Sequence, residues 1–383
     1  MFSTLYQSHN RHATWLELFF DLVFVAVIGV ITHDLAHTHH GHISVEQLLR
    51  FPLVFIPVWW IWMTHTLYAN RFDTDSREHR LISLTIMGLL IVLSTFAQTS
   101  LGEDFALFVV LYCVIRAILM AGYLHVHSTK GEQVVFARDM ALSIGIGSLI
   151  SLGSLLLEGV AKFAVFYAGV LIDMIWQVSL RHKTANVPVD RAHLVERSGL
   201  LAIIILGESI IAMVASLSDV NWQVTTVIGA IAGFALIGAI WWVYFDSFHM
   251  LEKAARIKTA NAFIYSHLLL CMGLLLLANL IRHAILSDLD QSTYGLLAIT
   301  GLVFFYLGKQ IPYWYAFPPW RKAIIGNTLV CIALTVISTQ LPSIQWSLVG
   351  MMVAIMVYVY LTHKRILSVS VDDYMEDHAA HAN

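Results

Sequence analysis

Twelve long apolar runs divide this chain, and they constrain its fold more than any other feature of the sequence. Each is close to the roughly 20 residues that an α-helix needs to cross the hydrocarbon core of a bilayer. Of all residues, 58% are hydrophobic and only 12% are charged, and the mean hydropathy is +0.74. A soluble domain carries about 25% charged residues, and a chain this apolar lacks the polar residues to cover its surface. We therefore predict an all-α, polytopic membrane protein.

The predicted spans follow the uninterrupted apolar stretches. They are expected at 14–36, 46–68, 80–100, 104–126, 136–157, 161–181, 194–217, 222–246, 261–284, 292–310, 322–340 and 344–363. The string MGLL recurs at Met87 and Met272, and a Trp-Trp pair recurs in the second and eighth spans. These echoes suggest two parallel six-helix halves. We expect one integral membrane domain over residues 1–383, with halves 1–185 and 186–363 and a cytoplasmic tail, 364–383.

The basic residues set the expected orientation. Of the 22 Lys and Arg residues, all lie on one side of this topology except four: Arg50, Lys162 and Arg282 on the other side, and Arg116 within a span. The positive-inside rule then places both termini in the cytoplasm, and the bacterial inner membrane is the expected location. The net charge of −3 and the lack of a basic run exclude a nucleic-acid partner. We expect no cofactor, and the sequence leaves a homo-oligomer open.

Two carboxylates interrupt the first apolar run, which reads WLELFFDLVFV from Trp15 to Val25. Glu17 and Asp21 are four residues apart, so they share one face of a helix. An ionisable side chain at the centre of a membrane helix costs about 2.5–3.5 kcal/mol on insertion scales, so such residues are usually functional. The helix N-terminus favours negative charge only in the first turn. We therefore expect Glu17 near the interface and Asp21 inside the membrane.

Glu208 is the acid expected deepest in the second half of the chain. A rise of 1.5 Å per residue places it about 22 Å along the helix from His193, and the small residues beside it leave room for another helix or a water. His193, Glu196 and Arg197 cluster at the predicted cytoplasmic end of the same span. Glu208 is therefore the strongest candidate for an acid that titrates inside the membrane.

Arg116, midway through the fourth span, is the cation available to a buried acid. Its guanidinium forms a bidentate fork that suits a carboxylate in a low dielectric. Glu208 and Asp173, the latter in the sixth span, are the competing partners. The sequence predicts that one of them is neutralised and the other is free to titrate, and it leaves open which is which.

Further polar groups gather at the predicted cytoplasmic ends, including Asp246 in WWVYFD and His267 at the start of the ninth span. They are typical of interfacial anchors, and as a group they could line a vestibule. On the other side, HDLAHTHHGH contains His33 and His37 at a spacing that suits two metal ligands. A solvated, weakly metal-binding loop is the simpler interpretation of that stretch. No Walker, GxSxG, HExxH or CxxC motif occurs, which argues against ATP-driven transport and zinc proteolysis.

With these residues identified, the chain resembles the bacterial low-temperature requirement A (LtrA) family. The matching strings are WLELFFDLVFV, NRFDTD (70–75), the pair Glu196-Arg197, LGES (206–209) and WWVYFD (241–246). The resemblance implies an inner-membrane polytopic protein linked to growth in the cold, and it implies no substrate. FFDLVFVAVI (19–28) is also similar to the first helix of TMEM175-type potassium channels. Phe20, however, replaces the serine of the FSD motif in those channels, and the second half has no such motif.

Three functional hypotheses follow, all with the lipid bilayer as surroundings and a small solute or ion as ligand. The leading one is a secondary transporter or proton-coupled permease, in which Glu208 and Asp21 titrate and Arg116 and Asp173 support them. An ion channel with a constriction at Phe20, Phe24 and Ile28 is the runner-up. A membrane-embedded lipid-handling enzyme would use Glu17, His193 and Glu196 in acid–base roles. The alternative to all three is that these polar residues form a network that only fixes helix packing. An enzyme is the less favoured class.

The candidate residues for the transport or ion pathway are Glu17, Asp21, Arg116, Asp173, His193, Glu196, Arg197, Glu208, Asp246 and His267.

Overall fold

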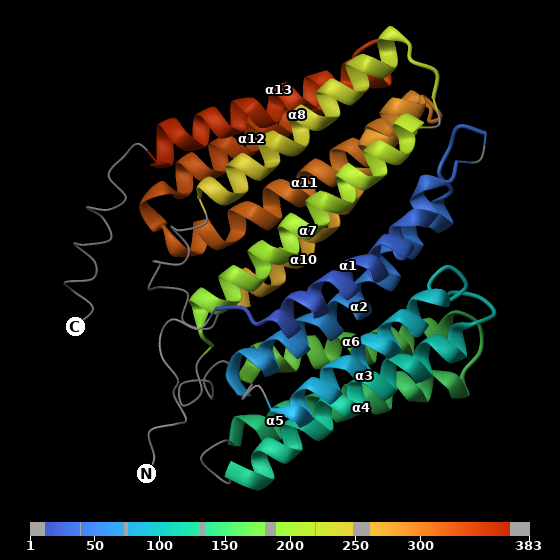
Figure 1. Ribbon diagram of the computed structural model, residues 1–383, viewed down its shortest axis with the longest axis vertical. Coiled ribbons are helices and arrows are strands. Elements are labelled where there is room, and N and C mark those ends of the chain that lie inside the picture. The colour runs from blue at the N-terminus through green and yellow to red at the C-terminus, as the bar shows by residue number, and fades with distance from the viewer. Residues whose placement is uncertain are drawn as a thin grey trace. The chain divides into compact units, whose positions relative to one another are not determined.

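The computed structural model describes residues 12–38, 40–72, 76–130, 135–180, 189–218, 220–247 and 261–367. Within these ranges twelve helices are long and apolar enough to cross a membrane (Figure 1). They are α1 (Trp15–His33), α2 (Val45–Phe72), α3 (Arg77–Thr95), α4 (Phe105–Lys130), α5 (Val135–Gly153), α6 (Gly159–Ser179), α7 (Arg191–Ser218), α8 (Val224–Asp246), α10 (Asn261–Leu286), α11 (Gln291–Ala316), α12 (Arg321–Ser338) and α13 (Ile344–Thr362). The predicted all-α class and the twelve spans are confirmed. Asp73, Asp75, His39, His249 and most of the predicted tail lie outside the described residues.

The third and tenth spans differ most from their predicted bounds. The tenth span was expected to end at residue 310, but α11 continues through Pro312 to Ala316. A proline removes one backbone hydrogen bond, and close packing on α10 compensates here, because a Cβ at Gly308 would lie 2.7 Å from Leu270 Cα. α3 ends at Thr95, before the predicted residue 100, and the Thr95 hydroxyl donates back to Val92 O at 2.7 Å.

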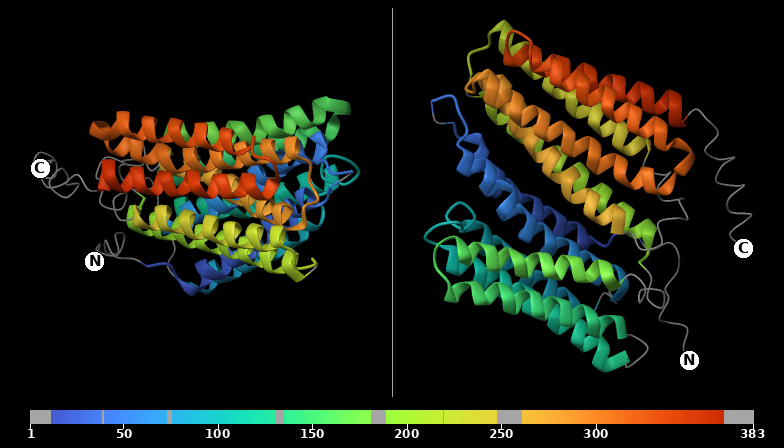
Figure 2. Two further views of the ribbon diagram at one scale, coloured as in Figure 1. Left: turned by 90° about the horizontal axis from the view of Figure 1, so that it is seen from above. Right: turned by 180° about the vertical axis from the view of Figure 1, so that it is seen from behind.

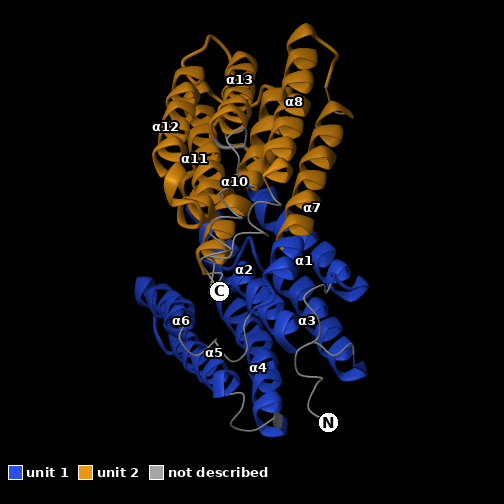
Figure 3. Cartoon of the chain, turned by 90° about the vertical axis from the view of Figure 1, so that its left-hand side faces the viewer, with its two compact units in different colours: residues 1–34, 49–197 blue, residues 35–48, 198–383 orange. Residues whose placement is uncertain are grey.

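The chain forms two compact units, coloured in Figure 3. Unit 1 contains residues 1–34 and 49–197, and unit 2 contains residues 35–48 and 198–383. The boundary between the units falls within α7: its residues up to Arg197 belong to unit 1, and the rest of the helix belongs to unit 2. The short segment 35–48, which runs from the end of α1 into the first turn of α2, is part of unit 2.

Three helix pairs recur in the same order within the two units. In unit 1, α3 packs on α4, α4 on α5 and α5 on α6. In unit 2, α10 packs on α11, α11 on α12 and α12 on α13. The other pairs differ: α8 packs on α13, seen in yellow and red in Figure 2, and on α10, whereas in unit 1 α1 packs on α3 and a hydrogen bond from the Tyr167 hydroxyl to Leu53 O joins α6 to α2. The three recurring pairs are of the kind that an internal repeat of six helices produces; the repeat and the parallel orientation of the halves stay predictions.

Small residues allow the closest helix contacts in both units. In unit 1 the α5–α6 crossing is so tight that a Cβ on Gly169 would lie 2.6 Å from Ser151 N, and one on Gly147 would lie 2.8 Å from Gly169 O. In unit 2 a Cβ on Gly233 would lie 2.6 Å from Ile281 Cγ2. Small residues serve this purpose in membrane helices, where the backbones must approach closely.

Gly169→Ala is therefore expected to destabilise the protein by about 1–3 kcal/mol, the usual cost of forcing extra atoms into a packed interior. Backbone atoms, which cannot rotate away, would meet the new methyl group. Thermal unfolding of the purified full-length protein in detergent measures the effect. Gly88→Ala in α3 is the matched control, because a Cβ there meets nothing within 4 Å. Equal unfolding temperatures for the two variants would contradict this account of the crossing.

Candidate functional site

The first turn of α1 fixes the position of the first buried acid. Thr14 Oγ1 accepts a hydrogen bond from Glu17 N at 3.3 Å, and the Glu17 carboxylate accepts one from Thr14 N at 2.8 Å. This reciprocal capping box satisfies two backbone donors at the helix start. Protein encloses Glu17 as completely as Asp21, since the two side chains are 1% and 0% exposed; the interfacial depth of Glu17 stays a prediction. Both point to one face of α1, as their spacing predicted.

Arg197 of α7 bridges the two carboxylates inside unit 1. Its Nε and Nη2 donate to Asp21 Oδ2 and Oδ1 at 3.0 and 2.5 Å, which is a bidentate fork. Its Nη1 lies 3.1 Å from Glu17 Oε1. Trp62 of α2 donates its indole N–H to Asp21 Oδ1 at 2.7 Å, and the ring lies 5.9 Å from the Arg197 guanidinium carbon. Glu17, Asp21, Trp62, His193 and Arg197 together are called the Arg197 cluster below.

The hydrogen bonds of Asn70 determine the protonation of His193. The Asn70 amide pairs with both backbone groups of Asp190: its Nδ2 donates to Asp190 O and its Oδ1 accepts from Asp190 N, each at 2.9 Å. This pairing fixes the orientation of the amide. Asn70 Nδ2 also lies 2.9 Å from His193 Nδ1, which must therefore accept. His193 is then a neutral imidazole that donates its Nε2–H to Glu17 Oε2 at 3.2 Å.

A second buried ion pair in unit 1 joins Arg116 to Asp173. Arg116 Nη2 donates to Asp173 Oδ2, and Arg116 Nη1 donates to Thr64 Oγ1 at 2.8 Å. Trp60 Nε1 and Ser143 Oγ also donate to the Asp173 carboxylate, at 2.6 and 2.7 Å. Of the two partners that the sequence left open for Arg116, the structure gives Asp173. Both Asp173 oxygens accept hydrogen bonds, so this acid is fully paired.

The other candidates lie apart from these two sites. Glu208 is half-buried in α7 and forms no hydrogen bond or ion pair in the described part of the chain. Glu196 is partly exposed and accepts from Ala13 N at 3.3 Å, with His12 Nδ1 at 3.4 Å. In unit 2, Asp246 is exposed at the end of α8, and His267 is buried in α10. The structure thus forms two sets of candidates: Glu17, Asp21, His193 and Arg197 in one, and Arg116 with Asp173 in the other. Glu208 belongs to neither set.

His33 and His37 are both exposed, at the end of α1 and in the following segment. Across the described ranges, no group of three or more His, Cys, Asp or Glu side chains could hold a metal ion. His37 contributes its backbone instead, because Gln47 Nε2 donates to His37 O at 3.0 Å.

The segment 35–48 is held on unit 2 by a buried histidine. His283 Nε2 donates to Leu35 O at 2.9 Å, and His283 Nδ1 lies 2.7 Å from Asp288 Oδ1. Arg282 donates to Ala36 O at 2.6 Å. Burial alone would raise the pKa of Asp288, but the hydrogen bond and charge of His283 and the charge of Arg282 outweigh it and lower that pKa below its usual range. Asp288 is therefore ionised at neutral pH and orients His283 toward the segment.

Sequence reasoning missed the tryptophans and the amide that complete these sites. The signal was present in the run of four residues from Trp59 to Trp62, because Trp60 and Trp62 are two apart on α2 and project to different sides. Trp60 donates a hydrogen bond to Asp173, and Trp62 donates one to Asp21. Asn70 was noticed only as part of NRFDTD.

Membrane-length helices with charged pairs buried between them define a multi-pass membrane protein. The chain belongs to the bacterial low temperature requirement A protein (LtrA) family, whose profile matches residues 12–360. The predicted resemblance is thereby confirmed over nearly the whole chain. The chain is also similar to the uncharacterized protein RA0937 of Rhizobium meliloti (strain 1021), with 24% identity over an alignment that covers 92% of this chain and 90% of that protein.

Proposed function

We propose that this protein is a proton-coupled secondary transporter of the bacterial inner membrane that carries a small solute or ion. The observation that carries the proposal is the sharing of one buried guanidinium, Arg197, between two buried carboxylates, Glu17 and Asp21. A coupled transporter needs an acid that is ion-paired in one state and protonated in another. Two acids that compete for one cation supply such a pair of states.

The surroundings of the two acids favour Asp21 as the proton carrier. Glu17 accepts hydrogen bonds from Thr14 N and from the neutral His193, in addition to its contact with Arg197. These donors stabilise an ionised Glu17. Asp21 depends on Arg197 and on the Trp62 indole. When Asp21 takes up a proton its fork with Arg197 weakens, and Arg197 becomes available to Glu17 alone.

Glu208 is proposed as a second titrating acid. It lies on α7, the helix that also carries Arg197, about 16 Å farther along the axis at 1.5 Å per residue. A half-buried carboxylate that forms no bond within the described residues can exchange a proton at low cost. Arg116 and Asp173 remain the supporting pair.

The packing of the first helix supports a transporter over the channel alternative. Phe20 stacks on His65 at 4.0 Å between ring centroids, and Phe24 lies 5.7 Å from Trp62. Ile28 is fully buried as well. Side chains packed in this way have no face left for a hydrophobic constriction. Glu17 and His193 are likewise closed off from a lipid headgroup, so the lipid-handling alternative gains no support.

Transport assays in proteoliposomes test the proposal. Vesicles that contain the full-length protein and a pH-sensitive dye are exposed to sodium, potassium and calcium salts, and then to amino acids and sugars. We expect at least one probe to move protons across the membrane with the unchanged protein. Asp21→Asn and Glu208→Gln should abolish that movement, while the exposed Arg77→Met should retain it. Uptake that proceeds equally with and without a pH gradient, or in Asp21→Asn, would refute proton coupling at the Arg197 cluster.

A further inference from the structure

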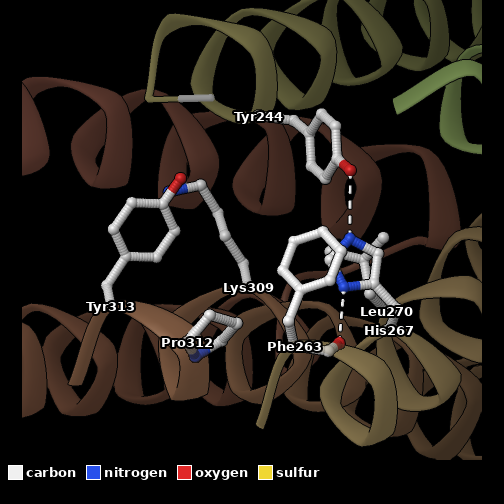
Figure 4. A pocket seen from close by; sticks show the side chains of 7 residues that line it. All are labelled: Tyr244, Phe263, His267, Leu270, Lys309, Pro312 and Tyr313. Carbon is white, nitrogen blue, oxygen red and sulfur yellow. Dashed lines mark hydrogen bonds between the residues drawn. The ribbon is translucent and has the colours of Figure 1, made fainter. Parts of the chain in front are cut away.

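A small pocket in unit 2 is separate from both ion-pair sites. It lies between α8, α10 and α11, and its volume of about 10 Å³ is room for about one water molecule. Figure 4 shows the side chains that line it. Aromatic and apolar side chains make up most of its lining, together with one histidine and one lysine. The lining residues are Tyr244, Phe263, His267, Leu270, Lys309, Pro312 and Tyr313.

Lys309 is the charged residue of this pocket, and it is only 3% exposed. Its ammonium lies 4.7 Å from the centre of the Tyr313 ring and 5.4 Å from that of Tyr358. Cation–π contacts of this kind recover only part of the hydration that a buried ammonium loses. Throughout the described ranges, Lys309 forms no hydrogen bond and no ion pair. Its charge is therefore incompletely compensated.

The other polar groups of the pocket already have neutral partners. His267 Nδ1 donates to Phe263 O at 2.8 Å, so its Nε2 accepts the hydroxyl hydrogen of Tyr244, 3.1 Å away (Figure 4). The Tyr313 hydroxyl donates to Ser247 O at 2.7 Å. None of these groups carries a negative charge. Asp246 acts on Lys309 from a distance only, because it is exposed and forms no ion pair with it.

We propose that this pocket binds one small monovalent anion, a halide such as chloride, on the ammonium of Lys309. The buried cation selects for negative charge, and the volume limits the bound group to about the size of one water. The binding requires no transport, so it stands or fails independently of the Arg197 cluster.

Thermal unfolding of the purified full-length protein tests the binding. The protein is titrated with sodium chloride and, in parallel, with sodium acetate, whose anion is larger than the pocket, while sodium sulfate maintains the ionic strength. We expect the unfolding temperature to rise with the logarithm of the chloride concentration, because a ligand that binds only the folded state stabilises it by mass action. Lys309→Met should lose this dependence, and Lys322→Met, at an exposed lysine of α12, should keep it. An equal response to acetate would contradict a pocket that admits only a halide.

A labelling experiment keeps the proposal testable if Lys309→Met does not fold. The unchanged protein is treated with acetic anhydride, and acetylation of each lysine is followed by mass spectrometry. Chloride should slow acetylation of Lys309 at least tenfold and leave that of Lys322 unchanged. The proposal is overturned if chloride does not alter the unfolding temperature, if Lys309→Met responds as Lys322→Met does, or if chloride slows both lysines equally.

Discussion

Arg197→Met is expected to be the most destabilising of the substitutions considered for unit 1, with a loss of about 3–5 kcal/mol in the free energy of unfolding. Methionine removes the guanidinium that Glu17 and Asp21 share, and both carboxylates are enclosed by protein. Neither can turn toward water, so each must be protonated or remain uncompensated. The yield of monodisperse protein and its unfolding temperature in detergent measure the loss.

Two further variants separate the loss of the charge from the loss of an arginine in general. Arg77→Met changes an exposed arginine at the start of α3 and should have little effect. The triple variant Glu17→Gln, Asp21→Asn, Arg197→Met removes the acids together with the cation, and it should recover much of the lost stability. An Arg197→Met protein as stable as Arg77→Met would show that the cluster does not depend on this charge.

Arg116→Met is expected to have the second largest effect, again about 3–5 kcal/mol, because it leaves Asp173 buried without its cation. Hydrogen bonds from Trp60 and Ser143 to the carboxylate remain, so the loss should be smaller than for Arg197→Met. Denaturation of the single and double variants in a mutant cycle with Asp173→Asn measures the coupling between the two side chains.

The double variant also distinguishes a supporting pair from a proton site. If Arg116 and Asp173 only hold α4 and α6 together, then Arg116→Met with Asp173→Asn should regain stability and keep proton-coupled transport. Asp21→Asn should do the opposite, with near-normal stability and no coupling. Loss of coupling in a stable double variant would move the proton site to Asp173.

The helices were predictable because hydropathy is a local property of the chain. An apolar segment in a bilayer must satisfy its backbone hydrogen bonds within a helix. The twelve spans therefore follow from the pattern of hydropathy along the chain. The spacing of Glu17 and Asp21 also predicted a shared face. The largest error in a bound, at the end of α11, arose because the helix continues through Pro312, where Gly308 allows close packing on α10.

The partners of the buried charges were not predictable, because they depend on how the helices are rotated and paired. Arg116 and Asp173 are on helices whose contact no local pattern reveals, and Glu208 was an equally acceptable partner on the sequence. The cover that neighbouring helices give to Glu17, in the first turn of α1, could not be predicted for the same reason. Trp62 and Asn70 carry no charge, so hydropathy gave no reason to link them with Asp21 and His193.

Infrared difference spectroscopy of the purified protein between pH 5 and pH 9 tests the central claim most directly. The claim is that Asp21 in the Arg197 cluster takes up and releases a proton. The carbonyl stretch of a protonated carboxylic acid should appear on acidification, lose the contribution of Asp21 in Asp21→Asn, and lose that of Glu208 in Glu208→Gln. A spectrum of Asp21→Asn identical to that of the unchanged protein would contradict the claim, because Asp21 would then keep one protonation state throughout.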